Sequence, residues 1–164
     1  RVINLSVILD GPQQSVADAV RYAHDRGVVV VAAAGNGGGL DPTYPAAYPE
    51  VISVAAAQED GTLYPWTQRG PWVDVAAPGC SPSTARGGGF TMFCGTSSAS
   101  ASVAGVVALA LSVVPTASNV DVERAISETA APLRGGGVAS GHVDALALVD
   151  ALRAAAPLVS QLAP

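Results

Sequence analysis

The spacing of apolar residues changes twice within the first 34 residues of the chain. Residues 2–7 form a short β-branched run that ends before the Asp10-Gly11-Pro12 segment, which predicts a strand and a turn. Apolar residues then recur at helical spacing after Ser15, the expected N-cap, and Gly27 is expected to end the helix. Residues 28–34 are continuously apolar, as in a strand covered on both faces. Strand, helix and buried strand in succession predict a right-handed βαβ unit and an α/β fold.

The rest of the chain continues with buried strands and largely apolar helices. The predicted elements are strands at 51–57 and 72–76, a glycine turn at 87–89 between two extended arms, and helices at 97–114, 119–130 and 144–155. We therefore expect one domain over residues 1–156 and a loose tail over 157–164.

Composition narrows the class of protein. Charged residues make up only 13% of the 164 residues, the net charge is −5, and all eight cations are Arg. So little charge argues against a disordered chain, and the lack of basic clusters argues against binding to nucleic acid. No apolar run approaches the roughly 20 residues of a membrane span. Because Arg1 opens directly on an apolar strand with no leader before it, we expect the chain to be cut from a longer protein.

Two segments could carry chemistry. Ser97, expected in the first turn of a helix, would lie among unpaired N–H groups, and its own amide could donate to an oxyanion. A plain Ser/Thr helix cap explains the same residues. Asn36 follows a buried strand on a glycine-rich loop and could supply a second oxyanion donor, although it could equally be a turn residue.

Longer blocks decide between these alternatives. They are VINLS at 2–6, GVVVVAAAGN at 27–36, YPAAYP with VISV at 44–54, VDVAAPG at 73–79 and GTS at 95–97. In these blocks, which extend over about residues 2–150, the chain resembles the subtilisin-like serine proteases (subtilases). The resemblance implies a three-layer α/β fold with helices on both faces of a parallel sheet, of which this chain is the C-terminal half. It further implies an endopeptidase that forms an acyl-enzyme on Ser97, with Asn36 in the oxyanion hole.

The resemblance also implies the substrate-binding residues. One wall of the primary pocket would be Ala33, Ala34 and Gly35, the other Ser6, Val7 and Ile8, and Thr43 would lie near its base. These side chains carry no charge, so the residue before the cleaved bond (P1) is expected to be small or apolar. Ile8 stands where the family has a small glycine, which would narrow the pocket. A cis peptide is expected at Tyr44-Pro45.

In the family, the catalytic Asp and His lie before the segment that corresponds to residues 2–6, so this chain does not contain them. His24 is expected at the surface and His142 in a structural role, so neither serves as general base and the isolated chain should be inactive. The expected partners are a protein or peptide substrate and an N-terminal half that carries the Asp and His. The unpaired edge at residues 2–6 could also lead to self-association. The alternative function is a peptide-binding module that keeps the scaffold without the chemistry.

Cys80 and Cys94 are the two cysteines of the chain. If the stretch between them is a hairpin, its ends meet and a disulfide is geometrically feasible, whereas two buried free thiols are the alternative. A disulfide would fit a secreted or cell-surface protein, as most of the family are. We expect no metal site in this chain and no cofactor. Calcium binding is common in the family, but no ligands are assigned here.

Overall fold

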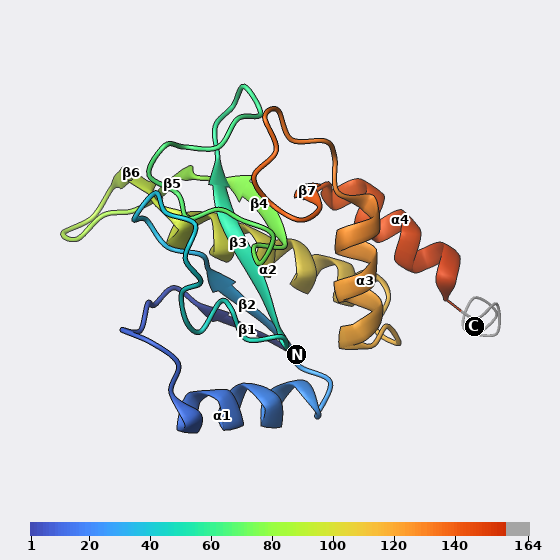
Figure 1. The fold of residues 1–164 in the computed structure, drawn as a ribbon. Helices are drawn as coiled ribbons and strands as arrows, with labels where there is room; N and C mark the ends of the chain where they lie inside the picture. The colour runs from blue at the N-terminus through green and yellow to red at the C-terminus, as the bar shows by residue number, and fades with distance from the viewer. Residues whose placement is uncertain (157–164) are drawn as a thin grey trace.

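The computed structural model describes residues 1–156 (Figure 1). Its elements, in chain order, are β1 Val2–Leu5, α1 Gln14–His24, β2 Val29–Ala33, β3 Val51–Ala57, β4 Val75–Pro78, β5 Cys80–Thr84, β6 Phe90–Cys94, α2 Thr96–Val113, α3 Asn119–Thr129, β7 Gly141–His142 and α4 Ala145–Ala155. The predicted tail at 157–164 lies outside the described residues.

A parallel sheet forms the centre of the molecule. Its strand order is β1-β2-β3-β4-β7, with β1 at one edge. Every residue of β2 and β3 is buried, which explains why β2 is continuously apolar and why Ser53 is the one polar residue of β3. Parallel pairing brings the carboxyl ends of the strands to one side of the sheet, where ligands bind in α/β proteins.

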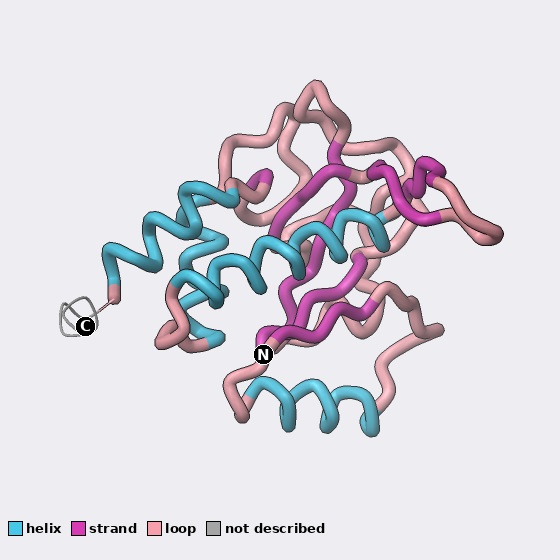
Figure 2. Tube along the Cα trace, turned by 180° about the vertical axis from the view of Figure 1, so that it is seen from behind, coloured by secondary structure: helices cyan, strands magenta, loops and turns pink. Residues whose placement is uncertain are grey.

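Helices cover both faces of this sheet (Figures 1 and 2). Val30 and Ala32 of β2 pack with Val20 of α1, whereas Val29 and Val31 pack into a core with α2, α3 and α4. The alternation along one strand therefore separates two hydrophobic cores, as the pleat of a strand requires. The predicted three-layer α/β architecture is confirmed.

The start of α1 differs from the prediction. The N-cap is Gln13 rather than Ser15, and no side chain caps the helix. The hydroxyl of Tyr48 accepts from the Gln13 N–H (2.8 Å) and donates to the Gln13 carbonyl (3.0 Å). A residue distant in sequence therefore fixes where the helix begins. The helix ends at His24, earlier than predicted, with Asp25 as its C-cap, and Gly27 lies in the turn that follows: its φ is +73°, and its N–H donates to the His24 carbonyl at 2.9 Å.

The strand predicted at 72–76 instead spans Val75–Pro78. The Asp74 carboxylate accepts from the backbone N–H of Ser53 at 2.8 Å and from its hydroxyl at 2.7 Å. A side chain thus takes the donor that backbone pairing would have used, and the ladder between β3 and β4 begins only at Val75.

The predicted glycine turn and its two arms are present as the β5–β6 hairpin, which extends away from the sheet (Figure 1). Its second strand leads into α2, which lies across one face of the sheet (Figure 2). Within the described residues, α2 is the one helix whose length and apolarity would suffice to cross a membrane. Its contacts with β2 and β3 make it a core helix of this fold.

Candidate active site

Ser97 lies in the first turn of α2, directly after Gly95 and Thr96. Gly95 is the N-cap, with a φ of +147° that side chains rarely adopt, and its N–H donates to the Gly79 carbonyl at 2.8 Å. Ser97 is partly exposed, whereas Thr96 and Ser98 on either side of it are buried. The partial positive charge of the helix N-terminus therefore acts at an accessible hydroxyl.

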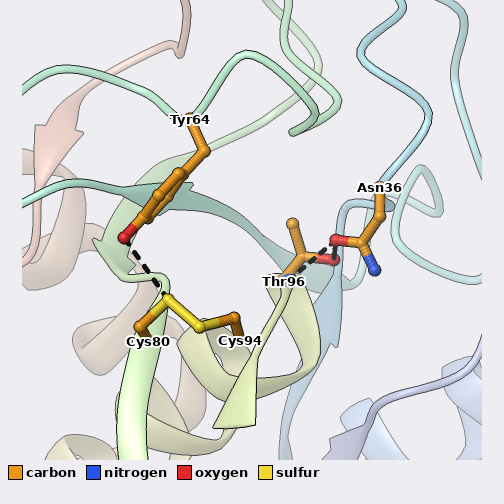
Figure 3. The surroundings of a disulfide bond; sticks show 5 residues. All are labelled: Asn36, Tyr64, Cys80, Cys94 and Thr96. Carbon is orange, nitrogen blue, oxygen red and sulfur yellow. Dashed lines mark hydrogen bonds between the residues drawn. A yellow bond between two sulfur atoms is a disulfide. The ribbon is translucent and has the colours of Figure 1, made fainter. Parts of the chain in front are cut away.

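Thr96 fixes the orientation of the Asn36 side chain (Figure 3). The Asn36 Oδ1 accepts from the Thr96 backbone N–H at 2.9 Å and from the Thr96 hydroxyl at 3.0 Å. Since a backbone N–H can only donate, the amide oxygen must face Thr96, and the Asn36 Nδ2 points the other way. The Thr96 hydroxyl in turn accepts from the buried N–H of Gly35 at 3.0 Å.

Two N–H donors flank the space that Gly95 leaves empty. A Cβ on Gly95 would lie 3.5 Å from the Asn36 Nδ2 and 3.7 Å from the Ser97 backbone nitrogen. Converging donors beside a nucleophilic hydroxyl can stabilise the negative oxygen that develops when that hydroxyl attacks a carbonyl group. The structure thus brings together Ser97 and Asn36, as the sequence predicts.

The segment that carries Ser6 lies against the same end of α2. The Ser6 hydroxyl donates to the Ser97 carbonyl at 3.2 Å and lies 3.3 Å from the Ser100 hydroxyl. Val7 and Ile8, which follow Ser6, are exposed.

Ile8, Gly35 and Thr43 also meet. A Cβ on Gly35 would lie 3.6 Å from both Ile8 Cδ1 and Thr43 Cγ2, and Thr43 donates to the Ala34 carbonyl at 2.5 Å. Ala33 and Ala34 have almost fully buried side chains, so their contribution to a pocket would come from the backbone. The Tyr44-Pro45 peptide is cis, as predicted.

A hollow of about 510 Å³ opens beside Ser97. The side chains around it are small or aromatic and uncharged, and they include Ser6, Ser81, Phe93, Ser98, Ala101 and Ser102. Phe93 comes from β6, so the hairpin forms one wall of this hollow and α2 forms another.

Both histidines lie elsewhere. His24, predicted at the surface, is partly buried with 21% of its side chain exposed, and its Nε2 lies 3.3 Å from Glu123, so it joins α1 to α3. Burial raises the pKa of Glu123, the charge of Asp74 adds to this rise, and His24 opposes it. His142 lies on β7, and its Nδ1 is 3.0 Å from the carbonyl of Val143, the next residue. Neither ring forms a hydrogen bond with Ser97.

Cys80 and Cys94 form a disulfide at the base of the hairpin (Figure 3). The Tyr64 hydroxyl donates to the Cys80 sulfur at 3.3 Å. The alternative of two free thiols is therefore wrong.

Two residues at the site were missed by sequence reasoning. Thr96 belongs to the GTS block, but its hydrogen bonds to Asn36 and Gly35 follow only from coordinates. Gln68, in a loop far along the chain, contacts the loop that carries Asn36, and no local pattern signals it.

Comparisons with known proteins agree with these observations. The sequence model of the "Subtilase family" matches residues 1–147. The "Thermophilic serine proteinase" of Bacillus sp. (strain AK1) is 42% identical over 137 residues, which are 83% of this chain and 34% of that protein. Thermitase of Thermoactinomyces vulgaris is 40% identical over 153 residues, 92% of this chain and 54% of that protein.

A solved structure, "Proteases from Pseudoalteromonas arctica PAMC 21717", superposes with a TM-score of 0.83 at 29% identity over 92% of this chain and 51% of that one. The chain thus spans between about a third and a half of the length of these relatives.

Proposed function

The chain belongs to the subtilase family of proteases, and we propose that it supplies the nucleophile and the oxyanion hole of a serine endopeptidase. In this proposal the Ser97 oxygen attacks the carbonyl carbon of a peptide bond while its proton passes to a general base. The C–N bond then breaks, the amine leaves with that proton, and water hydrolyses the acyl-enzyme. The substrate is a protein or peptide with a small or apolar P1 residue.

The hydrogen bonds from Thr96 to the Asn36 carbonyl oxygen carry the proposal. They leave the Asn36 Nδ2 free to donate, next to the Ser97 N–H, toward the oxygen of the bond under attack. These donors act only once charge has developed on that oxygen, so they would stabilise the transition state more than the bound substrate.

The general base is proposed to come from a segment outside residues 1–156 that carries the family's Asp and His. His24 pairs with Glu123 and His142 lies at β7, so neither is placed to take the Ser97 proton. The uncharged hollow beside Ser97 offers room for such a segment. Without a base the hydroxyl is a weak nucleophile, and the chain alone should not hydrolyse peptides.

The edge strand β1 supports a second proposal, that the isolated chain associates with copies of itself. Among the described residues it pairs only with β2, and its Ile3 and Asn4 are exposed. An open edge can pair with a further strand, so we propose that the chain alone self-associates there. A monomer by light scattering would contradict this.

Labelling with a fluorophosphonate tests the function. The chain alone should label slowly at Ser97, and the protein that also supplies the Asp and His should label rapidly. Ser97→Ala should abolish labelling, whereas the matched control Ser98→Ala should keep it. If Ser97 does not label even in the protein that supplies the Asp and His, the protease function is refuted and the peptide-binding module is favoured.

We also propose that the protein acts outside the cytoplasm, at the cell surface or secreted. The Cys80–Cys94 disulfide supports this, because such bonds persist in oxidising compartments.

A further inference from the structure

We propose that Gln68 is a positioning residue that holds the loop of residues 35–43, called the Asn36 loop below, in the shape that the oxyanion hole and the primary pocket require. The inference rests on the proposed function for its catalytic consequence, but its structural part stands by itself.

Gln68 is bound to the Asn36 loop at three points. The residue is 7% exposed; its Oε1 accepts from the Gly39 N–H at 2.5 Å, and its Nε2 donates to the Asp41 carbonyl at 3.0 Å. Its backbone N–H donates to the Gly35 carbonyl at 2.8 Å. One residue therefore pairs with the beginning, middle and end of the loop, and a buried amide of this kind is costly to leave unpaired.

Besides Gln68, the loop is held by the Arg69 N–H, which donates to the Gly39 carbonyl at 3.1 Å, and by the Trp72 Nε1, which donates to the Leu40 carbonyl at 2.8 Å. It contains three consecutive glycines, Gly37, Gly38 and Gly39, which supply no side chains and are the least restricted residues in an unfolded chain. A Cβ on Gly37 or Gly39 would lie only 3.2 Å from the Gln68 Oε1. The glycines thus let the backbone wrap closely around the amide of Gln68.

Gln68 is in turn anchored to the sheet through Thr67, which is fully buried. The Thr67 hydroxyl accepts from the Ala56 N–H of β3 at 3.0 Å and lies 3.2 Å from the Gln68 carbonyl, to which it donates. The positions of Gln68 and of the Asn36 loop are therefore set by the core rather than by the surface.

The contacts of Gln68 reach both parts of the candidate site. Its Cγ lies 2.9 Å from the point where a Cβ on Gly35 would be, and Ile8 and Thr43 lie 3.6 Å from that same point. Gly35 immediately precedes Asn36. A change at Gln68 should therefore disturb the oxyanion donor and the predicted pocket together.

Gln68→Met keeps the length and approximate volume of the side chain but removes both of its hydrogen bonds. The matched control is Gln58→Met, because Gln58 makes two bonds within its own loop, to Thr62 and Leu63. In this chain, hydrogen exchange of the Gly39 amide should accelerate in Gln68→Met and stay unchanged in Gln58→Met. An equally protected Gly39 in Gln68→Met would overturn the proposal.

The second experiment measures catalysis in the protein that also supplies the Asp and His. The rate is divided by the concentration of active sites, which is found by titration, to give kcat. A misplaced Asn36 donor should lower kcat by about 10- to 100-fold with a smaller change in KM, since the donor acts in the transition state. Unchanged kcat in Gln68→Met would overturn the positioning role. If Gln68→Met does not fold, the same measurements on Gln68→Asn decide, because that side chain stays polar but is one methylene too short to keep the bonds to the Gly39 N–H and the Asp41 carbonyl. If the wild-type protein is inactive, the proposed protease function is refuted. Hydrogen exchange of the Gly39 amide would still test whether Gln68 holds the Asn36 loop.

Discussion

Replacing Thr96 by Val should lower the free energy of unfolding by more than so small a change of side chain would suggest. The two side chains have the same shape, but Val lacks the hydroxyl that donates to the Asn36 Oδ1 and accepts from the Gly35 N–H, both at 3.0 Å. Thr96 is fully buried, so water cannot replace its hydroxyl as the partner of the buried Gly35 N–H. The substitution therefore isolates one hydroxyl group.

The expected loss follows from these two bonds. The bond to Asn36 is worth about 1 kcal/mol, and leaving the buried Gly35 N–H unpaired costs about 1–3 kcal/mol. The free energy of unfolding should therefore fall by about 2–4 kcal/mol, a large share of the 5–15 kcal/mol that domains typically have. Thr96→Ser keeps the hydroxyl and loses one methyl group, which costs only about 1 kcal/mol.

Urea denaturation of both variants measures the difference, since the midpoint shifts in proportion to the lost free energy at constant slope. In the protein with its general base, Thr96→Val should also lower kcat more than Thr96→Ser, because Asn36 then keeps only the Thr96 N–H as a partner. The reasoning is refuted if Thr96→Val is as stable as Thr96→Ser.

Three further predictions concern other parts of the chain. Replacing Cys80 and Cys94 by Ser opens a loop with a sequence separation of 14 and should lower the free energy of unfolding by about 3 kcal/mol in urea titrations; an unchanged midpoint would contradict it. Burial raises the pKa of Glu123 above its ordinary 4.5, so the folded chain holds a proton that the unfolded chain releases, and stability falls as pH rises through that interval. Glu123→Gln should therefore gain stability over wild type as pH rises from about 4, and a pH-independent difference would argue against it. In the active protein, Ile8→Gly should open the space near Gly35 and raise kcat/KM for Leu or Phe at P1 relative to Ala, whereas an unaltered profile would exclude Ile8 from the pocket.

Strands with buried surroundings were the easiest elements to predict. The limits of β3 agree with the prediction, because a strand covered on both faces is mostly apolar, here with Ser53 as its one polar residue. The start of α1 and of β4 could not be predicted, because Tyr48 and Asp74 take backbone hydrogen bonds that local propensity assigns elsewhere. Element type follows from local pattern, whereas boundaries depend on tertiary contacts.

The candidate site divides in the same way. The proximity of Ser97 and Asn36 could be predicted from the sequence blocks that contain them, and their catalytic roles stay a prediction. Gln68 could not, because its role depends on the shape of a loop that lies about 30 positions earlier in the chain. The glycines at 37–39 predict only a glycine-rich loop, whereas in the structure they pack closely around the buried side-chain amide of Gln68.

The surface of α2 adds to the proposal that another segment completes the site. From Val103 to Leu111 the helix has no polar side chain, a pattern typical of helices buried on every side. Its outer face nevertheless exposes Ala101, Gly105, Ala108 and Leu109, a stripe of mostly small residues that begins one turn after Ser97. Small residues allow another backbone to approach closely, and a segment packed along this stripe would end beside the nucleophile.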